Sequence, residues 1–271
     1  MWVRKGVKLP RVRFLGHVAL VRLPDSLDEL EHEIGLEILR RHPRVRSVLR
    51  IYEVRGSVRE PAVKLIAGSP ETETIHRENM CLFKLDAAKL MFSLGNFYER
   101  TRMTRVVKQG ETVVDMFAGV GQFTIPISVH SKPKMVYAFE YNIDAFRYLL
   151  ENIKINKVQD RVRAFMDDNR NAARYGLKGK ADRIIMGYFS GTVEFFGTAL
   201  QLAKPTGAII HFHDLAKKNN GWLDMYRECG KVATTLGYGL ELIGYRMVKS
   251  YSPSLAHWVL DLRAIPHQSF S

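Results

Sequence analysis

The chain has 271 residues, of which 46% are hydrophobic and 25% charged, the composition of an ordinary globular protein with one or two domains. Its formal net charge of +13 favours a polyanionic partner, because clustered Lys and Arg residues gain affinity by releasing counterions from phosphates. No apolar run reaches the roughly 18–20 residues of a membrane span, and no apolar signal-peptide segment follows the basic N-terminus. Two distant cysteines exclude a disulfide framework. We therefore expect a cytoplasmic protein without a membrane partner.

The N-terminal quarter of the chain has the pattern of a small basic α+β lobe. Residues 1–64 hold fourteen Lys and Arg against eight Asp and Glu, an excess more typical of a binding surface than of a generally solvated face. An apolar run predicts a strand at residues 17–23, and an acidic start followed by an apolar stripe predicts a helix over residues 25–42. Two further strands are predicted at residues 47–53 and 62–66.

Glycine, serine and proline at residues 68–70, followed by a polar stretch to residue 78, predict a linker. From about residue 104 strands and helices alternate, and the strands are apolar on both faces. We predict an α/β fold with a Rossmann-like, doubly wound, mostly parallel sheet, whose ligands bind at the carboxyl ends of its strands. The predicted domains are residues 1–75, a small basic α+β domain, and residues 76–271, the ligand-binding domain.

The predicted elements of the second domain follow one another along the chain. The strands are residues 112–116, 135–139, 162–165, 181–186 and 208–213, with two closing edge strands at 241–251 and 257–263. The helices are residues 121–130, 143–156, 191–202 and 222–236.

The segment DMFAGVGQFT, residues 115–124, follows the first of these strands and opens a helix. Its glycines allow the backbone to approach a ligand where any Cβ would collide. We assign Asp115, Phe117 and Gly119 to a ligand-binding loop, in which Asp115 either accepts a hydrogen bond from the ligand or orders the loop. A dinucleotide-binding loop would have a further glycine at the position of Thr124.

Acidic and amide side chains close the next two strands. Glu140 ends the second strand, where a carboxylate can accept hydrogen bonds from both hydroxyls of a ribose. Asp168 and Asn169 end the third strand, where they can read an adenine edge, and Asp167 is the alternative if the register slips by one residue. Because the three strand ends are neighbours in such a sheet, they predict a nucleoside-binding site. The alternative is that they are polar residues that only cap loops.

These residues resemble the class I S-adenosylmethionine-dependent transferases and, more closely, the Trm5/TYW2 family of enzymes that modify position 37 of tRNA. The likeness covers nearly the whole chain. It rests on the segments FKLDAAKLMFSLGNFYER (83–100), DMFAGVGQFTIP (115–126), FEYN (139–142), DDNR (167–170), DRIIMGY (182–188) and KSYSPSLAHWVLDL (249–262). The resemblance implies S-adenosylmethionine as co-substrate, the anticodon region of a tRNA as partner, no metal and no obligate protein partner.

Two segments separate the branches of this family. Its guanosine N1-methyltransferases carry Asn-Leu-Pro or Asn-Pro-Pro after the fourth strand, where this chain has Gly187-Tyr188. They also carry Pro-Arg-Leu after Phe-Ser, where this chain has Leu94-Gly95-Asn96. Both segments resemble instead the archaeal aminocarboxypropyltransferases of wybutosine synthesis. The resemblance therefore implies transfer of the 3-amino-3-carboxypropyl group of S-adenosylmethionine to 4-demethylwyosine at position 37 of tRNA(Phe), with release of methylthioadenosine.

The resemblance also implies roles for single residues. Ser93 and Arg100 carry over as S-adenosylmethionine-binding positions, and a guanidinium can pair with the carboxylate of the methionine arm. For Arg100 the alternatives are an ion pair with Glu99 or a contact to a tRNA phosphate. Gly187 and Tyr188 are expected to line the pocket of the substrate base. No residue is assigned as a catalytic acid or base.

Two weaker patterns and two rival functions complete the hypotheses. His211 and His213 alternate on one strand, but no further ligands accompany them, so we predict no metal site. A tRNA guanine-37 N1-methyltransferase using the same cofactor is the alternative function, which the missing Asn-Pro segment disfavours. A non-catalytic RNA-binding module is the third, and the presence of Glu140 and Asp168 disfavours it.

Overall fold

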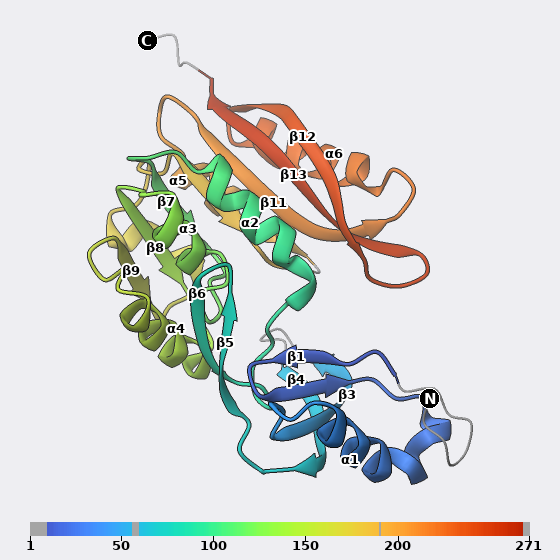
Figure 1. Ribbon diagram of the computed structural model, residues 1–271. Helices are drawn as coiled ribbons and strands as arrows, with labels where there is room; N and C mark the ends of the chain where they lie inside the picture. The colour runs from blue at the N-terminus through green and yellow to red at the C-terminus, as the bar shows by residue number, and fades with distance from the viewer. Residues whose placement is uncertain (1–9, 56–59, 190, 268–271) are drawn as a thin grey trace. The chain divides into compact units, whose positions relative to one another are not determined.

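The computed structural model describes residues 10–55, 60–189 and 191–267 (Figure 1). The chain divides into two compact units, Met1–Leu94 and Gly95–Ser271. A four-stranded sheet and a two-stranded hairpin belong to the first unit, and a seven-stranded sheet belongs to the second. Each unit therefore has a sheet of its own.

The first unit is built on a sheet with the strand order β1-β2-β3-β4. Its strands are β1 (Arg13–Leu15), β2 (Val18–Val21), β3 (Ser47–Arg55) and β4 (Glu60–Gly68). Helix α1 (Glu31–Arg41) connects the parallel strands β2 and β3 and buries Ile34 and Ile38 in the core of this unit. The predicted strands and helix are confirmed, except that the helical segment begins with a 3₁₀ turn, η1 (Asp25–Leu30).

The polar stretch that we predicted to be a linker is a strand. β5 (Glu73–Glu78) pairs with β6 (Cys81–Asp86) in an antiparallel hairpin of the first unit. The two turn residues, Asn79 and Met80, have φ angles of 47° and 60°, the signs of a type I′ turn, which usually contains glycine. The linker prediction was wrong because the buried side chain of Thr74 anchors an otherwise polar strand, and because no glycine marks the turn. A domain division at residue 75 falls within β5.

The second unit is built on a sheet with the strand order β12-β13-β11-β10-β7-β8-β9. The five strands from β11 to β9 are parallel, and β13 and β12 are antiparallel to their neighbours. The strands are β7 (Thr112–Asp115), β8 (Met135–Phe139), β9 (Val162–Phe165), β10 (Arg183–Met186), β11 (Ala208–Lys217), β12 (Tyr238–Ser250) and β13 (Leu255–Pro266). The predicted doubly wound, mostly parallel sheet is confirmed. Its strand order reverses between β7 and β10, where ligands of such sheets bind.

Helices flank this sheet. They are α2 (Phe97–Val106), α3 (Thr124–His130), α4 (Ile143–Ile155), α5 (Phe196–Leu202) and α6 (Gly221–Thr235). In Figure 1, α2 crosses in front of β11, and α6 lies behind β12 and β13. We did not predict α2, because two of its three buried residues, Glu99 and Arg100, are charged and leave no apolar stripe. In the described part of the chain, no helix is both long and apolar enough to cross a membrane.

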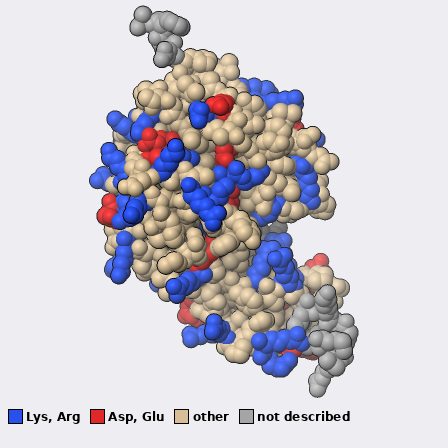
Figure 2. Space-filling view, turned by 45° about the horizontal axis from the view of Figure 1, so that its top comes forward, with Lys and Arg blue, Asp and Glu red and all other residues tan. Residues whose placement is uncertain are grey.

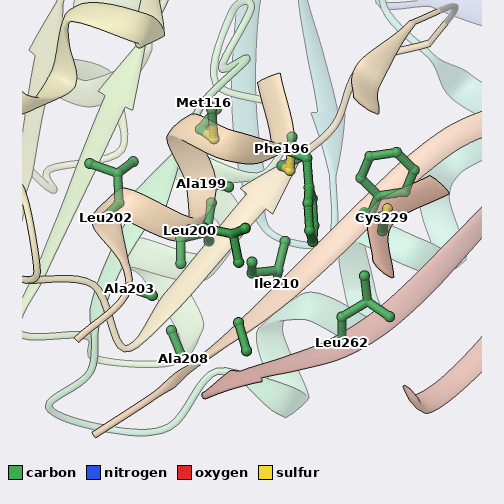
Figure 3. Close-up of a cluster of buried hydrophobic side chains, with 14 of the residues drawn as sticks. Met116, Phe196, Ala199, Leu200, Leu202, Ala203, Ala208, Ile210, Cys229 and Leu262 are labelled. Atoms are coloured by element: carbon green, nitrogen blue, oxygen red, sulfur yellow. The ribbon is translucent and has the colours of Figure 1, made fainter. Parts of the chain in front are cut away.

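A hydrophobic core between the sheet and two of these helices holds the strands in place. Figure 3 shows Phe196 and Leu200 of α5 close to Ile210 of β11 and Cys229 of α6, all members of one buried cluster. Each large side chain buried in this way stabilises the fold by roughly 1.5–3 kcal/mol. Val114 and Met116, at the end of β7, and Met186, at the end of β10, belong to the same buried cluster. The loops that follow these two strands therefore start from fixed positions.

Candidate functional site

The loop after β7 is held in place by the aspartate that ends the strand. The Asp115 carboxylate accepts hydrogen bonds from the Phe117 backbone N–H (3.3 Å) and from the Thr124 hydroxyl (2.7 Å). The side chain is fully buried, and burial raises its pKa to about 6. Both carboxylate oxygens of Asp115 therefore accept hydrogen bonds from the loop itself. Of the two roles predicted for Asp115, these bonds fit the ordering of the loop. Thr124 closes the loop at the position where a dinucleotide-binding protein would have glycine.

The carboxylate at the end of β8 faces this loop. Glu140 Oε2 accepts a hydrogen bond of 2.7 Å from the Gly119 N–H, and Oε1 accepts one of 2.7 Å from the Asn142 N–H. Gly119 has a φ of +56°, a left-handed conformation that favours glycine. Burial raises the pKa of Glu140, and the hydrogen bonds from backbone N–H groups of Asn142, Gly119 and Tyr141 oppose this rise. The structure thus brings the predicted loop and the predicted ribose-binding acid together.

Asn169 joins the end of β9 to the loop after β7. It is the first residue of the 3₁₀ helix η3 (Asn169–Tyr175), and its side-chain N–H donates to the Met116 carbonyl (3.0 Å). Its side-chain oxygen Oδ1 is buried and has no hydrogen-bond partner among the described residues. A buried acceptor that stays unpaired costs about 1–3 kcal/mol, which a hydrogen-bond donor would offset. This fits the predicted contact to adenine.

The two aspartates before Asn169 have partners within their own loop. Asp168 caps η3 by accepting from the Arg170 backbone N–H (2.9 Å), and its hydrogen bonds to the Arg170 side chain lower its pKa. Asp167 accepts from Asn171 Nδ2 (2.9 Å) and from the Tyr175 hydroxyl (2.8 Å), and these bonds lower its pKa too. The adenine contact of Asp168, with Asp167 as its alternative, stays a prediction.

The segment after β10 packs against the glycine loop through aromatic rings. The Tyr188 ring stacks on the Phe117 ring, with centroids 4.8 Å apart and an angle of 14° between the planes. Gly187 lies close to the Phe123 ring: a Cβ added at position 187 would be only 2.8 Å from Phe123 Cε2. A side chain at position 187 would therefore force the ring or the segment to move. The predicted base-pocket residues thus contact the predicted ligand loop.

The two residues predicted to bind the methionine arm lie in different units. Ser93 is buried in the first unit, and Arg100 is buried on α2 in the second. Arg100 Nη1 donates to Gln122 Oε1 (3.4 Å), which connects α2 to the glycine loop. Glu99, considered above as a partner of Arg100, pairs with Arg102. The ligand contacts of Ser93 and Arg100 stay predictions.

A buried set of charges that the sequence pattern did not reveal attaches α2 to the sheet. The Arg102 guanidinium donates two hydrogen bonds of 3.0 Å to Asp261 on β13, and two of 2.9 and 2.6 Å to Glu99. Asp261 also accepts from Arg246 (3.0 Å) and from His211 Nδ1 (2.6 Å). Burial opposes its charge, but these donors lower the pKa of Asp261 well below its usual range. The one available signal was an aspartate inside the apolar run WVLDL.

Both histidines of β11 have protein partners. His211 lies between Asp261 and Arg183, with its Nε2 2.8 Å from Arg183 Nη1. His213 Nδ1 lies 2.9 Å from His257 Nε2, and burial lowers the pKa of His213 to about 4, so this ring is neutral at pH 7. Across the described residues, no three His, Cys, Asp or Glu side chains are placed to hold a metal ion.

Two protein-family models match the chain. The TRM5/TYW2 methyltransferase domain matches residues 74–238, and the TYW2 N-terminal domain matches residues 11–72. The chain belongs to the TRM5/TYW2 family. The glycine loop, Arg100 and the strand ends at Glu140, Asn169 and Gly187 all lie within the TRM5/TYW2 methyltransferase-domain match.

Proteins of the TRM5/TYW2 family resemble the chain over most of its length. The tRNA(Phe) (4-demethylwyosine(37)-C(7)) aminocarboxypropyltransferase of Pyrococcus horikoshii is 40% identical, over 92% of this chain and 87% of that protein. The tRNA (guanine(37)-N(1))-methyltransferase Trm5b of Pyrococcus abyssi is 36% identical, over 92% of this chain and 73% of that protein. The crystal structure of M. jannaschii TYW2 in complex with AdoMet is 36% identical, with a TM-score of 0.76, over 94% of this chain and 100% of that chain. The predicted family and α/β fold are confirmed.

Proposed function

We propose that this protein transfers the 3-amino-3-carboxypropyl group of S-adenosylmethionine to 4-demethylwyosine at position 37 of tRNA(Phe), with release of methylthioadenosine. The observation that carries the proposal is the relative with this activity in its name, which is 40% identical over 92% of the chain. The methyltransferase relative is less similar, at 36% identity. Gly187-Tyr188 supports the same choice, since it replaces the Asn-Pro type of segment expected of the family's methyltransferases.

The predicted ligand contacts fit S-adenosylmethionine. Glu140, placed beside Gly119, accepts hydrogen bonds from the ribose hydroxyls. Asn169 offers its partnerless buried oxygen to the adenine amino group. Arg100 pairs with the carboxylate of the methionine arm, and Ser93 is the second residue that we propose for binding S-adenosylmethionine. Glu140 and Asn169 thus hold the nucleoside of S-adenosylmethionine, and Arg100 and Ser93 hold its amino acid arm.

The remaining assigned residues shape the site. Asp115 orders the glycine loop, and Asp168 contacts adenine beside Asn169. Tyr188, supported by Phe117, lines the pocket of the acceptor base. S-adenosylmethionine supplies a sulfonium, which is already an activated leaving group, so these residues act mainly by positioning. The carbon that they hold in line with the acceptor determines which group is transferred.

The partner and location follow from the same proposal. The protein binds the anticodon region of tRNA(Phe) in the cytoplasm and requires neither a membrane nor another protein. The first unit is the small basic domain that contacts tRNA, and the second unit is the catalytic domain, whereas the division at residue 75 predicted from the sequence falls within the β5–β6 hairpin. The widespread Lys and Arg side chains in Figure 2 support a polyanionic partner.

One assay separates the candidate functions. The protein is incubated with tRNA(Phe) that carries 4-demethylwyosine and with S-adenosylmethionine labelled on either the methyl or the carboxyl carbon. Carboxyl label in the tRNA without methyl label supports the proposal. Methyl label alone would show a methyltransferase, and tight tRNA binding without either label would show a non-catalytic RNA-binding module.

A further inference from the structure

The first unit contains an open hollow that has no part in the site described above. It has a volume of about 680 Å³. Three segments form it: the turn between β1 and β2, the loop between α1 and β3, and the β5–β6 hairpin. Its lining residues are His17, Pro43, Arg44, Arg46, Glu73, Thr74, Ile75 and Lys84. We call it the basic hollow.

The basic hollow is shaped by backbone contacts. The His17 N–H donates to Thr74 Oγ1 (3.1 Å), and the Arg46 N–H donates to the His17 carbonyl (2.8 Å). Gly16 has a φ of +56°, and a Cβ there would lie 2.0 Å from Thr74 Oγ1. Gly68 has a φ of +90°, and its Cβ would lie 2.1 Å from the Arg46 carbonyl oxygen. Only glycine permits these approaches, so the three segments are held together without any ligand.

Two cations in the basic hollow are left without acidic partners. The side chains of Arg44 and Arg46 are exposed, and neither forms an ion pair in the described part of the chain. Several other cations of the first unit are paired. Arg40 and Arg41 bind Glu37 at 2.8 and 2.6 Å, and Lys84 binds Glu73 at 2.9 Å. The basic hollow therefore presents two guanidinium groups whose donors remain available to an anion.

The chemistry of the lining selects the kind of anion. A guanidinium is a planar fork of donors that matches the geometry of a phosphate. None of the lining residues is Phe, Tyr or Trp, and both nitrogens of the one ring, His17, lie near protein groups: Nδ1 is 3.0 Å from Thr74 Oγ1 and Nε2 is 3.4 Å from the Glu71 carbonyl. The lining therefore has no large aromatic side chain on which unpaired bases would stack. The lining thus suits the outside of a double helix, where phosphates are exposed and the bases are stacked inside.

We infer that Arg44 and Arg46 bind the phosphate backbone of a double-helical stem of the tRNA. This inference rests on the proposed function, which supplies tRNA as the substrate. The contacts position the tRNA and read no sequence, because phosphates are the same at every base pair. They give the first unit a defined role in substrate binding, separate from the nucleoside site in the second unit.

The test uses the full chain with Arg44→Ala and Arg46→Ala combined. Its affinity for a tRNA(Phe) transcript is measured by filter binding over a range of KCl concentrations. Each lost phosphate contact removes about 0.9 from the slope of log K against log salt, so the slope should fall by about 1 to 2. At about 0.1 M salt this amounts to a roughly 10- to 100-fold loss of affinity. Affinity for S-adenosylmethionine, measured without tRNA, should not change.

Arg40→Ala combined with Arg41→Ala is the matched control, because it removes the same charge from the same unit but from residues already paired with Glu37. Its salt slope should stay within about 0.5 of the wild type. An unchanged slope in the Arg44/Arg46 variant, or equal losses in both variants, would overturn the inference. Circular dichroism and the thermal midpoint establish that both variants are folded.

A competition experiment tests the commitment to a double helix. A short RNA duplex should displace tRNA from the wild type better than a single strand of the same length, and the Arg44/Arg46 variant should lose this preference. Equal competition by the single strand would overturn the double-helical assignment. Binding of vesicles with anionic lipids that disappears in the variant, while its tRNA slope stays unchanged, would assign the basic hollow to a membrane surface. The proposed function is tested separately, by the label that the wild type transfers.

Discussion

Arg102 on α2 and Asp261 on β13 form a two-pronged ion pair in which both nitrogen–oxygen distances are 3.0 Å. The exposed fractions of the two side chains are 19% and 10%, so water screens the pair little. Arg102 also binds Glu99, one residue before the arginine that we propose for the methionine carboxylate. The pair therefore attaches to the sheet the helix that carries a predicted ligand contact.

Replacing Arg102 should destabilise the protein strongly. Arg102→Met removes two hydrogen bonds from each of the buried carboxylates Glu99 and Asp261, and breaking a buried pair in this way costs about 3 kcal/mol or more. Arg263→Met is the control, because its pair with Glu241 is half exposed on the neighbouring strands β12 and β13 and should contribute less than about 1 kcal/mol. Urea unfolding measures both. Similar losses in the two variants would contradict the importance of the buried charges.

Replacing Glu140 should weaken S-adenosylmethionine binding and spare tRNA binding. Glu140→Ala removes a carboxylate that is proposed to hold two ribose hydroxyls, and hydrogen bonds to a charged group contribute about 1.5–3 kcal/mol each. We expect a loss of roughly 10- to 1000-fold in cofactor affinity by calorimetry, with tRNA affinity unchanged. The control is Asp144→Ala, an exposed carboxylate in the first turn of α4. Wild-type cofactor affinity in Glu140→Ala would overturn the ribose assignment.

Adding a methyl group at Gly187 should slow the transfer reaction. In Gly187→Ala the new Cβ would lie 2.8 Å from Phe123 Cε2, and overpacking of this kind costs about 1–3 kcal/mol. If the strain displaces the segment that carries Tyr188, single-turnover transfer should fall about tenfold or more. Gly230→Ala, in α6, is the control, since no atom lies within 4 Å of its Cβ and alanine favours the helix. The proposed pocket would be wrong if both variants reacted at the wild-type rate.

His213 should make the protein less stable as the pH falls below neutral. Burial lowers the pKa of His213 from the ordinary 6.5 to about 4, so between these values the unfolded chain takes up a proton that the folded chain does not. Stability from this residue is complete above pH 6.5 and is lost towards pH 4, by at most about 3 kcal/mol. Asp115 acts in the opposite direction, because its pKa is raised to about 6 and its protonated form is favoured in the fold.

The contribution of His213 can be isolated by comparison with His213→Phe. Denaturant unfolding of both proteins from pH 4.5 to pH 7 should show a smaller decrease in stability on acidification in the variant. Asp115 and His211 are present in both proteins, so their contributions cancel in the difference. Parallel stability curves would show that the folded protein protonates His213 as readily as the unfolded chain does.

Local pattern was sufficient for most elements but not for β1, the β5–β6 hairpin and α2. The five parallel strands of the large sheet were predictable because buried parallel strands are apolar on both faces. β5 was not, since a single buried threonine and a turn at Asn79-Met80 leave almost no local signal. α2 was not, because its buried residues are charged and are stabilised by partners elsewhere in the chain. In β5 and α2 the decisive contacts are tertiary.

The sequence by itself determined the family and the meeting of three polar strand ends at the candidate site. In a doubly wound sheet the carboxyl ends of neighbouring strands must meet, so the order of Asp115, Glu140 and Asn169 along the chain already implies that they converge. Only the tertiary structure decided which polar side chains are hydrogen-bonded within the protein and which are not. Both oxygens of Asp115 bond to the glycine loop, whereas Asn169 Oδ1 has no partner among the described residues. Asp261 pairs with Arg102, 159 residues away, and such a pairing leaves no periodicity in either segment. The burial that makes this charge pair strong exists only once α2 has packed against the sheet.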